Sequence, residues 1–298
     1  MEIRRRIRRT VRYFRRRLNR QILSYCLFVS FGLAQAEYQI ITIPQNSLML
    51  SNHNGLSGYV DNNNPKKIYS FNIIKFPSNI NYFKLHYKKT SFSILDFGTL
   101  EDKINNQVFN RFNAYEANFQ YNSNKTIFNK FLLSYTFGGI YSKIENISSI
   151  AVAANIKINT RMPQEKIYFA LSINNIGKVL KEYTIKQMNL PLNIQLGIAY
   201  KLQQTSILLG YDLIYHDNFE SYEHIACLQF PIGDVININL SFSNLRKALL
   251  IDNYKDDWFY GIGGGITITS KIINTNIGIA SLGPAGFIYG ISLNRLLE

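Results

Sequence analysis

The sequence LNIQLGIAYKL, residues 192–202, decides how the rest of the chain is interpreted. Apolar side chains occupy every second position from Leu192 to Leu202, and small or polar residues such as Asn193 and Gln195 fall between them. Successive side chains of a β-strand point to opposite faces, so the pattern predicts a strand with one apolar and one polar face. A helix would bury Asn193 and Gln195 with the apolar residues. At about eleven residues the strand could cross a bilayer at a tilt.

Similar segments recur throughout the chain beyond residue 68. In residues 236–243, for example, Ile, Leu and Phe alternate with Asn and Ser. An even number of such strands separated by turn residues is typical of an all-β, transmembrane antiparallel β-barrel. The sequence predicts about fourteen strands, at residues 69–76, 80–87, 91–97, 113–121, 130–139, 147–158, 166–175, 192–202, 205–214, 221–230, 235–243, 258–268, 272–280 and 286–294.

The connections between these strands alternate in length. Gln203-Gln204 and residues 231–234 and 269–271 form short connections, whereas long ones are expected at the other end of the strands. Short turns on one rim and long loops on the other are the pattern of outer-membrane barrels. The long loops are predicted at residues 99–112, 176–191 and 244–257, and residues 122–129 are too many for the tight turn that the pattern requires there.

The polar face of the predicted strands favours a membrane barrel over a soluble sheet. A soluble sheet wets its polar face with charged groups, but only 17% of this chain is charged, against about a quarter in an average soluble domain. Asn, Ser, Gly, Ala and Gln suit a narrow lumen, while the apolar face meets lipid. Aromatic residues predicted to form interfacial girdles are Tyr69, Tyr82, Tyr135, Tyr215, Tyr222, Trp258 and Tyr260. A soluble secreted β protein with an aromatic core is the alternative.

Residues 1–36 resemble a secretory signal peptide. An arginine-dense block precedes an apolar run at residues 22–33, and Ala34-Gln35-Ala36 supplies the small residues that a signal peptidase needs at Ala34 and Ala36. A basic amphipathic helix at a membrane surface or an organelle transit peptide is the alternative. These residues hold ten Arg and one Glu, a charge of +9, and so leave only +5 of the net +14 to the rest of the chain. The charge therefore gives no reason to expect nucleic acid as a partner.

The remaining chain divides into two parts. Residues 37–68 end in the polar run Asn62-Asn63-Asn64-Pro65 and lack the strand pattern. We interpret them as a plug-like segment tucked against or inside the main body, and residues 69–298 as the barrel itself.

No motif predicts an enzyme, a cofactor or a metal site. The nucleophile elbow, the paired-histidine zinc motif and the P-loop are all absent from the sequence. The glycine run at residues 261–265 lies within an alternating strand, which favours close packing against a plug or a neighbouring backbone. A solvated loop is the preferred interpretation of Asp212, His216, Asp217, Glu220, Glu223 and His224, and an extracellular loop that of Asp252, Asp256 and Asp257.

Four stretches resemble, in order, segments of the PorV/PorQ family of the type IX secretion system. They are Asp96-Phe97-Gly98-Thr99-Leu100-Glu101, Asn174-Asn175-Ile176-Gly177, Leu190-Pro191-Leu192-Asn193-Ile194-Gln195-Leu196-Gly197, and Leu282-Gly283-Pro284-Ala285-Gly286 followed by Ile291-Ser292-Leu293. The S-A-R and G-G-A pieces of the family's amino-terminal part are absent, and Pro44, Ser47 and Asn64-Pro65 resemble remnants of that part. The chain also lacks a terminal aromatic residue.

The resemblance implies a fourteen-stranded barrel of the FadL-like group in the outer membrane of a Gram-negative bacterium. It also implies a non-enzymatic accessory or attachment role in type IX secretion, with a slight preference for the PorQ-like branch. The expected partners are other secretion-system proteins, secreted cargo and outer-membrane lipid. The family-motif residues carried over are Asp96, Gly98, Glu101, Asn175, Gly177, Leu190, Pro191, Gly197, Gly283 and Gly286.

The same barrel is compatible with a second function, a FadL-like transporter of small hydrophobic compounds. The polar but largely uncharged lumen predicts no large ion conductance in either case.

Overall fold

The computed structural model describes residues 38–57, 67–104, 107–128, 131–160, 166–183, 189–217, 220–244 and 260–296. All of them belong to one unit, residues 38–298. The predicted cleavage residues Ala34 and Ala36, Trp258 and most of the predicted loop at 244–257 lie outside the described residues. Among the described helices, none combines the length and the apolar character needed to cross a membrane.

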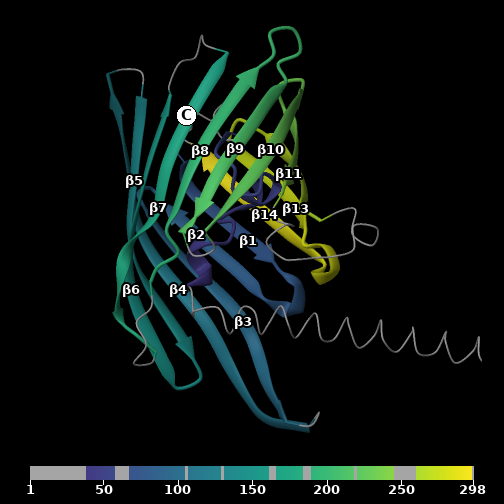
Figure 1. Ribbon diagram of the computed structural model, residues 1–298. Helices are drawn as coiled ribbons and strands as arrows, with labels where there is room; N and C mark the ends of the chain where they lie inside the picture. The colour runs from purple at the N-terminus through teal and green to yellow at the C-terminus, as the bar shows by residue number, and fades with distance from the viewer. Residues whose placement is uncertain are drawn as a thin grey trace, which may run out of the picture. The chain divides into compact units, whose positions relative to one another are not determined.

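The fold is a closed antiparallel barrel of fourteen strands, as the sequence predicted (Figure 1). Each strand pairs with its neighbours in the sequence, and β14 pairs with β1 to close the ring. The strands are β1 (Lys67–Lys75), β2 (Asn81–Tyr87), β3 (Thr90–Ile104), β4 (Gln107–Ile127), β5 (Phe131–Ile144), β6 (Ile147–Thr160), β7 (Ile167–Lys181), β8 (Asn193–Lys201), β9 (Leu208–His216), β10 (Ser221–Ile232), β11 (Ile236–Ser243), β12 (Ile262–Thr269), β13 (Ile273–Ser281) and β14 (Phe287–Leu296).

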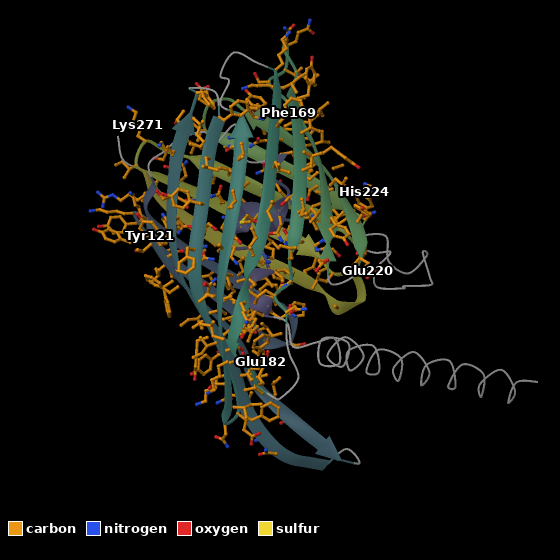
Figure 2. All side chains as sticks on the ribbon, turned by 60° about the vertical axis from the view of Figure 1, so that its left-hand side comes forward. Tyr121, Phe169, Glu182, Glu220, His224 and Lys271 are labelled. Atoms are coloured by element: carbon orange, nitrogen blue, oxygen red, sulfur yellow. The ribbon has the colours of Figure 1, made fainter. Side chains whose placement is uncertain are left out.

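The predicted alternation of faces is confirmed in the barrel wall. In β8, Leu196 is 53% exposed on the outer surface, whereas Gln195 is buried on the lumen side. The outer surface is covered by exposed aliphatic and aromatic side chains from every strand (Figure 2). An aqueous protein rarely exposes so extensive an apolar surface, whereas a bilayer requires one. The outer face of the barrel is therefore the face that meets lipid.

One prediction about the connections is wrong, because β3 and β4 extend well beyond the predicted ends. Residues 99–112 were expected to form a long loop, but the ladder runs from the pair Thr99–Asn113 to the pair Ile104–Gln107, with one shift of register on the way. Residues 122–127 likewise belong to β4 and leave a tight connection to β5, and residues 176–181 belong to β7. The wall formed by β3 to β7 is consequently taller than the rest of the barrel (Figure 1).

The two rims differ in their connections. At one rim all six connections between paired strands are short, such as residues 88–89 and 233–235. The opposite rim carries the two longest connections, residues 182–192 and 244–261. Bacterial outer-membrane barrels have short periplasmic turns and longer extracellular loops. We therefore refer to the first as the periplasmic rim and to the second as the extracellular rim.

The predicted aromatic girdle is correct only in part. Tyr69, Tyr135 and Tyr222 are exposed on the outer surface. Tyr82 and Tyr260 are almost completely buried and do not belong to a lipid-facing girdle. Tyr82 points inward because it shares the parity of the lumen-facing residues of β2, and its hydroxyl donates a hydrogen bond to Gln45 inside the barrel.

A charge placed on the lipid-facing side of β8 should destabilise the barrel. Leu196 lies midway along its strand, so Leu196→Arg should cost about 2–4 kcal/mol, whereas Leu180→Arg, beside Lys181 near the end of β7, should cost about 0–1 kcal/mol. Urea unfolding of both variants refolded into lipid vesicles measures the difference. Equal losses of stability would contradict the proposed lipid-facing band.

Candidate functional site

The candidate functional site is the lumen, which residues 38–57 occupy. We call these residues the plug segment. They comprise a short 3₁₀ turn, η1 (Gln39–Ile41), and a one-turn helix, α2 (Ser47–Ser51), whose first turn is capped because the Asn46 side chain accepts a hydrogen bond from the Met49 amide. The helix packs on the inner faces of β11 to β14 and β1, and η1 contacts β3 and β4 (Figure 1).

Glu116 of β4 holds the first end of the plug segment. Its Oε2 atom accepts a hydrogen bond of 2.7 Å from the Ile40 amide, and its Oε1 atom accepts one of 3.3 Å from the Ser142 hydroxyl. The Tyr38 hydroxyl hydrogen-bonds Ser149 of β6. Burial raises the pKa of Tyr38, so the phenol is neutral at physiological pH. Hydrogen bonds thus fix the first end to β4 and β6.

Asp212 of β9 holds the second end. The carboxylate is completely buried and accepts hydrogen bonds from the amides of Leu56 at 2.8 Å and Ser57 at 3.1 Å, as well as one from the Ser57 hydroxyl. Hydrogen bonds to a charged acceptor are roughly twice as strong as neutral ones. Because a carboxylate in a lumen needs such donors to offset its lost hydration, the side chain and the plug segment stabilise each other.

The middle of the plug segment makes mostly neutral contacts. The Ser47 hydroxyl donates to the Asn276 carbonyl at 2.8 Å, and the Nδ1 atom of His53 lies 2.8 Å from the Ser241 hydroxyl. Burial lowers the pKa of His53, so the imidazole is neutral at physiological pH. Gln195 of β8 donates to the Asn54 carbonyl at 3.0 Å. One charged wall group also takes part, since the Lys84 Nζ atom of β2 donates a hydrogen bond of 3.0 Å to the side-chain oxygen of Gln45.

Glycines of the wall let the plug backbone approach closely. A Cβ atom on Gly263 would lie 2.7 Å from the Ser51 carbonyl oxygen, and one on Gly265 would lie 2.7 Å from the Ser51 Cβ. A Cβ on Gly278 would clash with the Ser47 carbonyl. The interpretation of the glycine run as a surface packed against a plug is confirmed for Gly263 and Gly265.

The lumen changes character along its axis. Near the extracellular rim, apolar plug residues including Tyr38, Ile40 and Leu50 form one buried cluster with apolar wall residues. Further toward the periplasm the inward-facing residues are mostly Ser, Asn, Gln and Gly. The wall residues of the apolar cluster are Ile74, Tyr82, Leu95, Ile140, Ala151, Val179, Leu190, Ala280 and Ile288.

Four of the family-motif residues meet at the extracellular rim. The Asn175 side chain donates to the Pro191 carbonyl at 2.9 Å, and Asn175 has a left-handed backbone, φ 64°, where β6 and β7 shift register. A Cβ on Gly177 would lie 2.8 Å from Leu190 Cδ1 and would clash with a backbone carbonyl of β6. The structure thus joins the two motifs through the connection between β7 and β8.

The other motif residues occupy separate places. Asp96 accepts a hydrogen bond of 2.9 Å from the Gly98 amide at a bulge of β3, where Gly98 has φ 71°. Further along β3, Glu101 forms an exposed ion pair of 3.1 Å with Arg111. Gly283 and Gly286, with φ of 63° and 106°, form the turn between β13 and β14.

Gly197 is the one motif glycine that lies against the plug segment. A Cβ on Gly197 would clash with Asp212 and approach Leu56.

Sequence reasoning missed the two carboxylates that hold the plug segment. Asp212 was grouped with acidic and histidine residues of a loop, but it points into the lumen, while His216 pairs with Glu223 at 3.0 Å. No group of three metal-ligating side chains occurs among the described residues. The available signal was parity: Glu116 and Asp212 both occupy lumen-facing positions among small polar residues, where an acidic side chain needs a partner.

Comparison with known proteins supports the fold. No family model and no curated protein matches the sequence. Among solved structures, the chain is similar to a TodX deltaS2S3 mutant monoaromatic hydrocarbon channel, with a TM-score of 0.51, 7% identity, and coverage of 77% of this chain and 88% of that one. It is also similar to the CymD monoaromatic hydrocarbon channel, with a TM-score of 0.48, 7% identity, and coverage of 86% of this chain and 94% of that one. The toluene transporter TbuX of Ralstonia pickettii gives a TM-score of 0.48, 6% identity, and coverage of 85% of this chain and 92% of that one.

At such low sequence identity, the similarity shows a shared fold and nothing more. Together with the closed ring and the apolar outer face, the fold places the chain in the outer membrane of a Gram-negative bacterium. The PorV/PorQ resemblance remains a prediction.

A side chain added to the glycine surface should displace the plug segment. Gly278→Val should force the Ser47 backbone away from β13 and so raise the ion conductance of the barrel in planar bilayers well above that of the wild type. Gly139→Val is the matched control, since a Cβ on Gly139 meets no atom within 4 Å. Unchanged conductance in a folded Gly278→Val barrel would contradict the assignment of residues 38–57 as the barrier.

Proposed function

We propose that the chain is a non-enzymatic outer-membrane transporter for small hydrophobic compounds and that movement of the plug segment opens its route. The observation that carries this proposal is the apolar cluster inside the extracellular end of the lumen, which apolar residues of the plug segment fill. Binding sites for small hydrophobic molecules are concave, mostly apolar surfaces with few polar groups. When the plug segment moves, the same wall residues become such a surface.

The apolar end of the lumen argues against a general porin. A porin that passes water-soluble solutes keeps a polar, water-filled interior. Here many buried wall residues near the extracellular rim are aliphatic or aromatic, with Ile74, Leu95 and Ile140 almost completely buried, although the buried Glu116 pairs with Leu95 at the same level. Moving an ion past the aliphatic side chains would cost desolvation energy. A hydrocarbon gains free energy on the same path, about 25 cal/mol for each Å² of apolar surface buried.

Movement of the plug segment requires no covalent change. Hydrogen bonds to two wall carboxylates, to Lys84 and to several neutral groups hold it in place. Each neutral bond contributes a net of about 0.5–1.5 kcal/mol, and each charged one about 1.5–3 kcal/mol. Water entering the lumen can replace these bonds, so release of one end is energetically accessible. The similarity to a channel described as passing monoaromatic hydrocarbons supports this proposal at the level of the fold only.

A disulfide lock tests whether transport needs plug movement. The Ser57 hydroxyl oxygen lies 2.9 Å from Cys227 Sγ, so a Ser57→Cys variant should form a disulfide with Cys227 after oxidation and tie the plug segment to β10. Cells carrying the oxidised variant should take up radiolabelled toluene or oleate no faster than cells without the protein. Reduction with dithiothreitol should restore uptake to the wild-type rate.

Ser57→Ala is the matched control for the lock. It lacks the new thiol, so its uptake should not respond to oxidation. Uptake by the oxidised, disulfide-bonded variant at the wild-type rate would show that the plug segment is not the gate. Equal uptake by cells with and without the wild-type protein would reject transport itself.

The accessory role in type IX secretion is the second candidate. It is favoured by the junction of two family motifs at the extracellular rim, where Asn175 binds Pro191 and Gly177 packs against Leu190. It is favoured also by the tall wall of β3 to β7, which provides surface for other secretion-system proteins or secreted cargo. Such a role needs a shaped extracellular rim but no route through the lumen.

Loosening the motif junction separates the two functions. Asn175→Ala removes the bond to Pro191 and should reduce the recovery of secretion-system proteins by affinity purification several-fold if the rim is their binding surface. Asn122→Ala, which removes a side-chain bond to the Lys89 carbonyl at the periplasmic rim, is the matched control. Mass spectrometry identifies the partners, and heat-modified gel mobility confirms folding. Equal recovery with both variants, or no secretion-system protein with the wild type, would contradict the second candidate.

A further inference from the structure

The outer surface of the barrel has a cleft at its periplasmic rim. Its volume is about 420 Å³, and mostly outward-facing residues of β13, β14 and β1 to β4 line it, together with Ser70, His86 and Ser91 of the opposite parity. The lining is predominantly apolar and includes Tyr69, Phe71, Leu85, Phe92 and Phe119, each between 39% and 56% exposed. Since these side chains share the lipid-facing parity of their strands, the cleft opens toward the membrane and not toward the lumen.

Two rows of cross-strand neighbours form the cleft. One row is apolar: Phe71 pairs with Leu293 and Leu85, and Phe92 pairs with Leu85 and Phe119. The row nearer the rim runs through Arg295, Tyr69, Tyr87, Thr90 and Tyr121. In this second row the small Thr90 stands between two tyrosines, which leaves space beside the phenylalanines of the first row.

Basic groups surround the rim side of the cleft. Arg295 is exposed and lines the cleft directly. In the adjoining turn, Lys88 Nζ lies 5.1 Å from the centre of the Tyr87 ring, and Lys89 Nζ lies 6.0 Å from that of Tyr121. Within the described residues of this arc of the rim, which are 67–71, 85–92, 119–128, 266–276 and 291–296, the sequence contains no Asp or Glu.

The cleft therefore combines an apolar surface that an acyl chain could contact with a cluster of positive charge on its rim side. Tyrosines are enriched where hydrocarbon meets head groups, so Tyr69, Tyr87 and Tyr121 place the basic groups at head-group level. Lys271, a further basic residue of this arc, lies on the same side of the barrel as Tyr121 in Figure 2 and above it. The six short turns assign this rim to the periplasm, and the periplasmic leaflet is where a ligand would come from.

We propose that this cleft binds an anionic glycerophospholipid of the periplasmic leaflet, with an acyl chain along Phe71, Leu85 and Phe92 and the phosphate against Lys88, Lys89 and Arg295. A basic residue near a membrane surface contributes about 1 kcal/mol toward an anionic lipid, which is about a fivefold change in affinity. The site is independent of the proposed transport, because it lies outside the lumen.

Native mass spectrometry of the full chain in detergent tests the site. The wild type, incubated separately with phosphatidylglycerol and phosphatidylcholine of the same acyl chains, should retain at least about tenfold more of the anionic lipid. The variant K88Q/K89Q/R295Q should lose this preference. K166Q/K201Q is the matched control, because it removes basic groups from the opposite arc of the same rim and should keep the preference.

A second variant tests the apolar part of the cleft. Thr90→Trp fills the space between Tyr87 and Tyr121 and should lower the retention of phosphatidylglycerol while the basic residues stay in place. Heat-modified gel mobility shows that each variant is folded. Equal retention of the two lipids by the wild type, or an unchanged preference in the folded K88Q/K89Q/R295Q variant, would overturn the proposal. Displacement of the bound lipid by lipopolysaccharide alone would assign the cleft to the other leaflet and overturn it too.

Discussion

The whole structure depends on the absence of water in the hydrocarbon layer. A backbone amide or carbonyl that lacks a partner there costs several kcal/mol, so an open sheet edge cannot survive in lipid. The pairing of β14 with β1 removes the last edge, and every other strand already has two neighbours. Once the ring is closed, each residue of a strand has only two environments, lipid or lumen. This explains why a simple alternation of side chains controls so much of the molecule.

The same constraint makes the plug segment part of the fold and not an addition to it. A wall rich in lumen-facing Gly and Ser leaves space that the wall's own side chains cannot fill, and the plug backbone occupies it. The two buried carboxylates would be costly in an empty or apolar lumen, but they accept hydrogen bonds from Ile40 at one end and from Leu56 and Ser57 at the other. The plug segment therefore stabilises the wall as much as the wall holds the plug segment.

The sequence was sufficient for the number and approximate positions of the strands, because lipid and lumen impose alternation directly on the residues. It was insufficient for the extracellular parts of β3 and β4. Residues 99–112 are polar because they leave the hydrocarbon, so hydrogen bonds between strands persist there without the pattern that reveals them. The contacts of Glu116 and Asp212 could not be predicted either, since their donors lie 76 and 156 positions away and depend on how the plug segment threads the closed ring.

Small residues have different roles on the inner and outer faces of the barrel. On the inside, Gly263, Gly265 and Gly278 allow another part of the same chain to approach, and a carboxylate at each end determines which part it is. On the outside, Thr90 lies between two tyrosines and leaves a gap in their row. Basic residues lie beside this gap, which an ordinary gap in packing would not require. In both places the loss of side-chain volume would destabilise the barrel if nothing filled it. In this wall, charged side chains next to a position with a small residue therefore indicate a binding surface and not a packing defect.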